Sequence, residues 1–71
     1  MNTATTQITL NGETRQVAKS TTLADVLAEL GWKPTQVVVE HNGQVVPRTC
    51  LADVQLNEGD QVEIILPVAG G

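Results

Sequence analysis

Aromatic residues and cysteines are nearly absent from this 71-residue chain. It has no Phe, no Tyr, one tryptophan, Trp32, and one cysteine, Cys50. Its core must therefore be built from aliphatic side chains. A single cysteine excludes a disulfide framework, a cysteine-only zinc site and an iron–sulfur cluster. An unpaired thiol is also typical of a reducing compartment.

Basic residues are also scarce, with four Lys and Arg against eight Asp and Glu, giving a net charge of −4. The four are scattered, which argues against nucleic-acid binding because that depends on clustered Lys and Arg. No apolar run approaches the roughly 20 residues of a membrane span. The first six residues, MNTATT, are polar and do not show the charged start and following apolar segment of a signal peptide. We expect a cytoplasmic protein that binds neither nucleic acid nor membrane.

The length predicts one domain over residues 1–71, with an ordered core at about 6–67 and a flexible tail at 68–71. A chain of this size buries only about 60% of the surface that it exposes when unfolded. That leaves no room for an enzyme-sized cavity beside the core. We therefore expect a module that acts through partners, and its acidic charge favours docking on a basic protein surface.

Two Asn-Gly pairs, Asn11 with Gly12 and Asn42 with Gly43, each separate runs that read as strands. Asn-Gly favours the type I′ turn of a hairpin, which needs positive φ at both central positions. The first pair predicts strands at residues 6–10 and 13–18. The second predicts a hairpin whose return strand, residues 45–47, lies at a sheet edge because Pro47 cannot donate to a neighbour.

One amphipathic helix is predicted between the two hairpins. Its apolar residues recur at helical spacing: Leu23, Val26, Leu27 and Leu30. Thr22 is the expected N-cap, with Asp25 completing a capping box, and Gly31 suits the left-handed position that ends a helix. We expect Trp32, just beyond it, to close one end of the core.

The last third of the chain predicts a helical turn at 50–54, a tight turn at 57–60 and a final strand at 61–68. Alternation along that strand gives inward residues Val62, Ile64, Leu66 and Val68, and outward residues Gln61, Glu63, Ile65 and Pro67. The order ββ-α-ββ-β places this strand centrally and parallel to the first. It predicts an α+β fold of the β-grasp (ubiquitin-like) type, a mixed five-stranded sheet with one main helix on one face.

The ending LPVAGG places Gly70 and Gly71 directly after this strand. One interpretation is a frayed end, since termini are often disordered. The other is a working tail: four extended residues reach about 13 Å, and glycine fits a narrow channel. A terminal carboxylate, ionised at neutral pH, could attack the α-phosphate of ATP in a partner. The resulting acyl adenylate is open to a sulfur or nitrogen nucleophile.

The chain resembles a known family in its length and in two stretches, VVVEHNGQVVPR and EGDQVEIILPVAGG. The chain resembles the ThiS-type sulfur carriers of thiamine biosynthesis from about Gln7 onward. Gly59, Asp60 and the two terminal glycines also occur in molybdopterin-synthase small subunits and in ubiquitin. Two positions depart from the pattern: His41 stands where an aliphatic residue is usual, and Leu51 where a larger aromatic is expected.

The resemblance implies a carrier that is not itself an enzyme and binds no cofactor or metal. A ubiquitin-activating-type adenylyltransferase, using ATP and magnesium, would adenylate Gly71 at the end of a tail that includes Ala69 and Gly70. A sulfur donor protein would convert it to a thiocarboxylate, and thiazole synthase would receive the sulfur for the thiazole ring. A molybdopterin-type carrier and a non-reacting β-grasp interaction module are the alternatives.

Several side chains outside the tail are candidates for contacts with partners. Ile65, apolar on the outward face, is either covered by a neighbour or forms with Val38 the patch that binds an activating enzyme. Arg48 either anchors a partner carboxylate or is merely solvated. We expect Cys50 to be inert and the isolated His41 to be a partly exposed rim residue. Three acids are expected to be solvated in turns: Asp53, Glu58 and Asp60.

Overall fold

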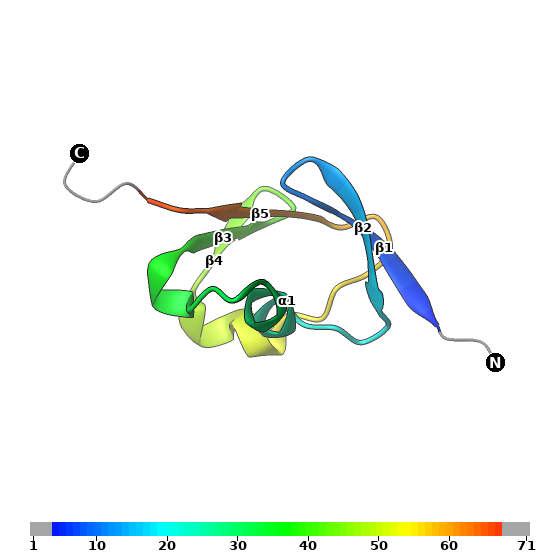
Figure 1. Ribbon diagram of the computed structural model, residues 1–71, viewed down its shortest axis with the longest axis horizontal. Coiled ribbons are helices and arrows are strands. Elements are labelled where there is room, and N and C mark those ends of the chain that lie inside the picture. The colour runs from blue at the N-terminus through cyan, green and yellow to red at the C-terminus, as the bar shows by residue number, and fades with distance from the viewer. Residues whose placement is uncertain (1–3, 68–71) are drawn as a thin grey trace.

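The computed structural model describes residues 4–67, which form one five-stranded mixed sheet in the order β2-β1-β5-β3-β4. The strands are β1 (Thr5–Leu10), β2 (Glu13–Ala18), β3 (Val38–His41), β4 (Gln44–Val46) and β5 (Gln61–Ile65). β5 is central, parallel to β1 and antiparallel to β3. The predicted β-grasp arrangement, with a parallel central strand and a short edge strand, is confirmed (Figure 1).

Both hairpin turns have the predicted geometry. Asn11 and Gly12 have φ of 50° and 84°, and Asn42 and Gly43 have φ of 51° and 85°, as a type I′ turn requires. Each asparagine side chain also holds β5. Asn11 Oδ1 accepts from the Ile64 backbone N–H at 2.8 Å, and Asn42 Oδ1 accepts from that of Gln61 at 2.9 Å. The two turns therefore fix the central strand from both of its neighbours.

The one α-helix in residues 4–67, α1 (Leu23–Leu30), begins and ends as its sequence predicts. Thr22 Oγ1 accepts from the Asp25 N–H at 3.1 Å, and Asp25 Oδ2 accepts from the Thr22 N–H at 3.0 Å. Gly31 ends the helix with φ of 82°. Two 3₁₀ helices follow, η1 (Pro34–Gln36) and η2 (Arg48–Asp53). The turn at 50–54 is thus confirmed as part of η2, whereas η1 was not expected.

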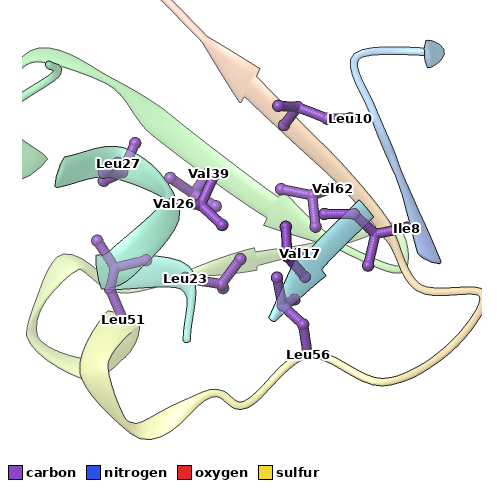
Figure 2. Packing of buried hydrophobic residues seen from close by; sticks show 10 residues of the cluster. All are labelled: Ile8, Leu10, Val17, Leu23, Val26, Leu27, Val39, Leu51, Leu56 and Val62. Carbon is purple, nitrogen blue, oxygen red and sulfur yellow. The ribbon is translucent and has the colours of Figure 1, made fainter. Parts of the chain in front are cut away.

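An aliphatic core fills the space between the sheet and α1. In Figure 2 its side chains lie between strands and helix, with Leu51 contributed by η2. The members are Ile8, Leu10, Val17, Leu23, Val26, Leu27, Val39, Leu51, Leu56 and Val62. The sheet is therefore covered on one face, where α1 and η2 both lie (Figure 1), and the alternate residues of its strands point away from that layer.

Two packing predictions are wrong. The final strand ends at Ile65, and Leu66, expected inward, is 51% exposed. The reason is that β3 begins at Val38, directly opposite Ile65, so within the described residues Leu66 and Pro67 have no β3 residue to pair with. Trp32 does not close the core but is 38% exposed, and the nearby residues that pack against the core are Leu30 and Val37.

Within residues 4–67 no helix is long and apolar enough to cross a membrane. The same part of the chain holds no group of three or more His, Cys, Asp or Glu side chains that could bind a metal ion.

Candidate carrier tail and docking face

The tail predicted to carry the chemistry continues from the central strand. Beyond Ile65, the exposed Leu66 and Pro67 lead away from the sheet at the far end from the start of β1 (Figure 1). The predicted tail residues Ala69, Gly70 and Gly71, and Val68 before them, lie outside the described residues. Their roles therefore stay predictions, and the structure describes only the strand that leads to them.

The two apolar residues predicted on the outward face are brought together. Val38 on β3 is the register partner of Ile65 on β5, so their side chains lie next to each other. Val38 is half-buried and Ile65 is 41% exposed. Of the two interpretations of Ile65, complete cover by a neighbour is therefore excluded. Its predicted contact with a partner stays a prediction.

A third apolar residue shares this face and was not predicted. Val45 on β4 is the register partner of Glu40, and Glu40 lies two residues from Val38 on the same strand, so all three point the same way. Val45 is 62% exposed. We call Val38, Val45 and Ile65 the outer patch. Sequence reasoning missed Val45 because its place beside Glu40 depends on the pairing register of β3 and β4.

Arg48 lies at the end of the sheet where β5 leaves it. β4 ends at Val46, the register partner of Val39, and Arg48 begins η2 two residues later. Its side chain is exposed, and within residues 4–67 it forms no ion pair. The structure thus places Arg48 and the outer patch toward the same end of the sheet but shows no contact between them.

The prediction that Asp60 is a solvated turn acid is wrong. Asp60 is buried and accepts three hydrogen bonds: from His41 Nε2 at 2.8 Å, from the Asn57 N–H at 2.9 Å and from Asn42 Nδ2 at 3.2 Å. Burial by itself would raise the pKa of the Asp60 carboxyl. The hydrogen bonds from His41, Asn57 and Asn42, with the His41 charge, outweigh it and hold that pKa below its usual value.

His41 is a rim residue as predicted, but it is not isolated. Its side chain is 22% exposed and bonded to Asp60. This cluster joins the turn at Asn42 to the turn at residues 57–60, at the end of β5 opposite to the tail. It is a structural contact and does not take part in the predicted chemistry. The sequence did contain a signal for this contact. The alternation of inward and outward residues along the strand places His41 inward, where a polar ring needs a hydrogen-bond partner.

The remaining candidates have ordinary environments. Cys50 is half-buried in η2, and Thr49 Oγ1 lies 3.9 Å from its sulfur. Asp53 and Glu58 are exposed as predicted, and Glu58 Oε1 accepts from the Gln7 N–H at 2.9 Å. Nothing in these contacts activates the Cys50 thiol.

The fold and the central strand leading to a Gly-Gly segment define a β-grasp domain. The model of the ThiS family matches residues 8–71, and the chain belongs to that family. Its structure is similar to the crystal structure of the thiamine biosynthesis protein ThiS from Geobacter metallireducens. The TM-score is 0.79 and the identity 31%, over 92% of this chain and 99% of the other. The resemblance to ThiS-type sulfur carriers is thereby confirmed.

Other relatives are longer or uncharacterised. The chain is 38% identical over 65 residues to a thiazole synthase of Paramagnetospirillum magneticum, and 42% identical over 65 residues to one of Magnetococcus marinus. It spans about a fifth of the length of each, since the matches cover 92% of this chain and 20% of those proteins. It is also 34% identical over 64 residues to the uncharacterised protein ycf40 of Pyropia yezoensis, covering 90% of both.

Proposed function

We propose that this protein carries sulfur for thiamine biosynthesis on Gly71, as a carrier protein and not as a catalyst. The observation that supports this most directly is the ThiS family match, which extends through Gly70 and Gly71. The fold is consistent with it, because the central strand leads out of the sheet toward those glycines.

The proposed chemistry requires a free carboxylate on Gly71. In an adenylyltransferase of the ubiquitin-activating type, this carboxylate attacks the α-phosphate of ATP, and pyrophosphate leaves. Magnesium and ATP belong to that partner. A sulfur donor protein then supplies hydrosulfide, whose sulfur attacks the acyl carbon and displaces AMP, so that Gly71 becomes a thiocarboxylate. Ala69 and Gly70 have small or absent side chains, so the backbone can enter a narrow channel without steric conflict.

A thiazole synthase is the proposed acceptor of the sulfur. The two relatives named thiazole synthase each include, within a chain about five times as long, a segment similar to this protein. A domain joined covalently to a synthase is kept at a high effective concentration beside it. This supports a direct transfer in which the present chain performs the same role as that segment and Gly71 returns to a carboxylate.

The outer patch and Arg48 are the proposed contacts with these enzymes. Val38 and Ile65 lie together on the open face of β3 and β5, next to the start of the tail. An enzyme that grips this face holds the tail in one direction. Arg48, exposed at the same end, is proposed to pair with a carboxylate of the partner.

The test is ATP–pyrophosphate exchange by the adenylyltransferase from the same genome, followed by growth of a deletion strain. The full chain should support exchange, and a chain lacking Gly71 should not. A strain without the gene should need thiamine for growth. Exchange without thiamine dependence would indicate a carrier for another product, such as molybdopterin. A chain that supports no exchange would be a non-reacting interaction module, which would contradict the proposal.

A further inference from the structure

Two glutamates face each other on the open side of the sheet. Glu40 on β3 and Glu63 on β5 are register partners, in the row next to Val38 and Ile65. Opposite residues in an antiparallel pair have Cβ atoms about 4.5–5.5 Å apart, and like charges there are destabilising. Within residues 4–67 neither carboxylate has an ion-pair or hydrogen-bond partner. The pair is therefore expected to disfavour folding, and no ion pair or hydrogen bond within residues 4–67 offsets it.

The other acids with partners have structural roles. Asp25 caps α1, Glu29 pairs with Arg15 at 3.4 Å, Glu58 accepts from a backbone N–H, and Asp60 accepts three hydrogen bonds. Glu40 and Glu63 differ from these four, because they face each other and have none of these contacts. An unfavourable arrangement at a site with no structural use is typical of a binding surface.

Apolar side chains lie on two sides of the pair of carboxylates. Val45 lies beside Glu40 on one side, and Val38 and Ile65 form the adjacent row toward the tail. A partner seated on these side chains would exclude water from the acid pair. Because a lower local dielectric strengthens the attraction between opposite charges, a cation inserted there would bind more strongly than on a polar surface.

We propose that this face docks a protein whose surface inserts an arginine or lysine between Glu40 and Glu63 and packs apolar side chains on the outer patch. An arginine suits the position well, because its planar guanidinium can donate to two carboxylates. Anionic lipid and nucleic acid do not fit, since both would bring phosphates to an acid pair on a chain of net charge −4. The inference rests on the proposed function, in which an enzyme must hold the domain while the tail reacts.

The variants Glu40→Gln and Glu63→Gln test this with little change of shape. Glu13→Gln is the matched control, because Glu13 is an exposed glutamate on the far edge strand β2. In the free protein, removing the repulsion should raise the melting temperature of each variant by roughly 1–5 °C. Glu13→Gln should raise it less. A fall in melting temperature for Glu40→Gln or Glu63→Gln would show that the pair is not repulsive and would overturn the inference.

Binding is then measured by calorimetry to the adenylyltransferase and to the thiazole synthase from the same genome. The double variant Glu40→Gln with Glu63→Gln should bind at least one of them at least about tenfold more weakly, as expected from the loss of a charge-assisted hydrogen bond. Its binding should also depend less on salt than that of the wild type. Glu13→Gln should bind like the wild type. A double variant that binds both enzymes like the wild type would overturn the inference.

The two proposals fail in different ways. If the wild type acquires sulfur while the double variant binds normally, the carrier function stands and the docking surface is wrong. If the wild type never acquires sulfur but the double variant loses binding to thiazole synthase, the docking surface stands and the carrier function is wrong. If the wild type binds neither enzyme, both are wrong.

Discussion

Replacing Asp60 by Asn should destabilise the fold substantially while changing one atom of the side chain. Asp60 Oδ2 accepts from both His41 Nε2 and the Asn57 N–H, and Oδ1 accepts from Asn42 Nδ2. An amide presents one NH₂ group, so it must point a donor at one of these donors. Hydrogen bonds to a charged group contribute about 1.5–3 kcal/mol each, and a buried unpaired donor costs about 1–3 kcal/mol.

We therefore expect Asp60→Asn to lower the free energy of unfolding by about 2–4 kcal/mol, measured by urea denaturation followed by circular dichroism. For a domain of this size the total is only about 4–10 kcal/mol, so the loss should be large. The control is Asp53→Asn, which removes the same charge from an exposed position in η2. It should change stability by less than about 0.5 kcal/mol.

The dependence on pH gives a second readout of the same contact. The Asp60 carboxyl has a lower pKa in the folded protein than its usual value. Between the folded and unfolded pKa values, the unfolded chain therefore binds more protons. The contribution of the Asp60 carboxylate to the free energy of unfolding is complete above the unfolded pKa, near 3.9. It is lost as the pH falls through the pKa of the folded protein. Asp60→Asn should flatten this acid dependence. If Asp60→Asn is as stable as the wild type and has the same acid slope, the reasoning is refuted.

Three other substitutions separate the fold from the chemistry. Cys50→Ala should leave sulfur loading intact, because the carrier atom belongs to Gly71; loss of loading in a folded variant, seen by intact mass, would assign the chemistry to the thiol. Ile65→Arg should weaken binding to the adenylyltransferase in calorimetry without unfolding the domain, since Ile65 is 41% exposed; wild-type affinity would show that the docking face is elsewhere. Asn11→Ala should lower the free energy of unfolding by about 1–3 kcal/mol in urea denaturation, because it removes the acceptor for the Ile64 N–H and leaves alanine at positive φ. Unchanged stability would show that this hydrogen bond to β5 contributes nothing.

Local signals predicted most of the fold. The Asn-Gly pairs marked both hairpins because few other dipeptides tolerate positive φ twice in succession. The Thr22–Asp25 capping box and Gly31 marked both ends of α1. These features depend on residues close in sequence, so they can be recognised without knowing what packs against them. The central, parallel position of β5 followed from the order of the elements.

What could not be predicted depends on contacts between distant segments. The end of β5 is set by where β3 begins, 27 residues earlier in the chain at the register pair Val38 and Ile65. Asp60 looked like a turn acid because His41, which binds it, is 19 residues away. The exposure of Trp32 depends on how neighbouring aliphatic residues fill the core.

The candidate docking face was also predicted only in part. Val38 and Ile65 were predicted together because alternation fixes which face each occupies, and the structure brings them together. Val45 and the facing pair of Glu40 and Glu63 were missed, since both depend on the pairing register of three strands. A surface made from several strands is visible only once those strands are aligned.

The most direct test of the account is the mass of the protein after sulfur transfer. The full chain is incubated with its adenylyltransferase, ATP, magnesium and a sulfur donor, and fragmentation in the mass spectrometer locates any modification. The account predicts an exchange of one oxygen for sulfur on Gly71, absent when ATP is omitted and absent from a folded chain lacking Gly70 and Gly71. That shortened chain should melt near the wild-type temperature, because every residue of the core cluster lies at or before Val62. An unmodified Gly71, or sulfur on Cys50 instead, would contradict it.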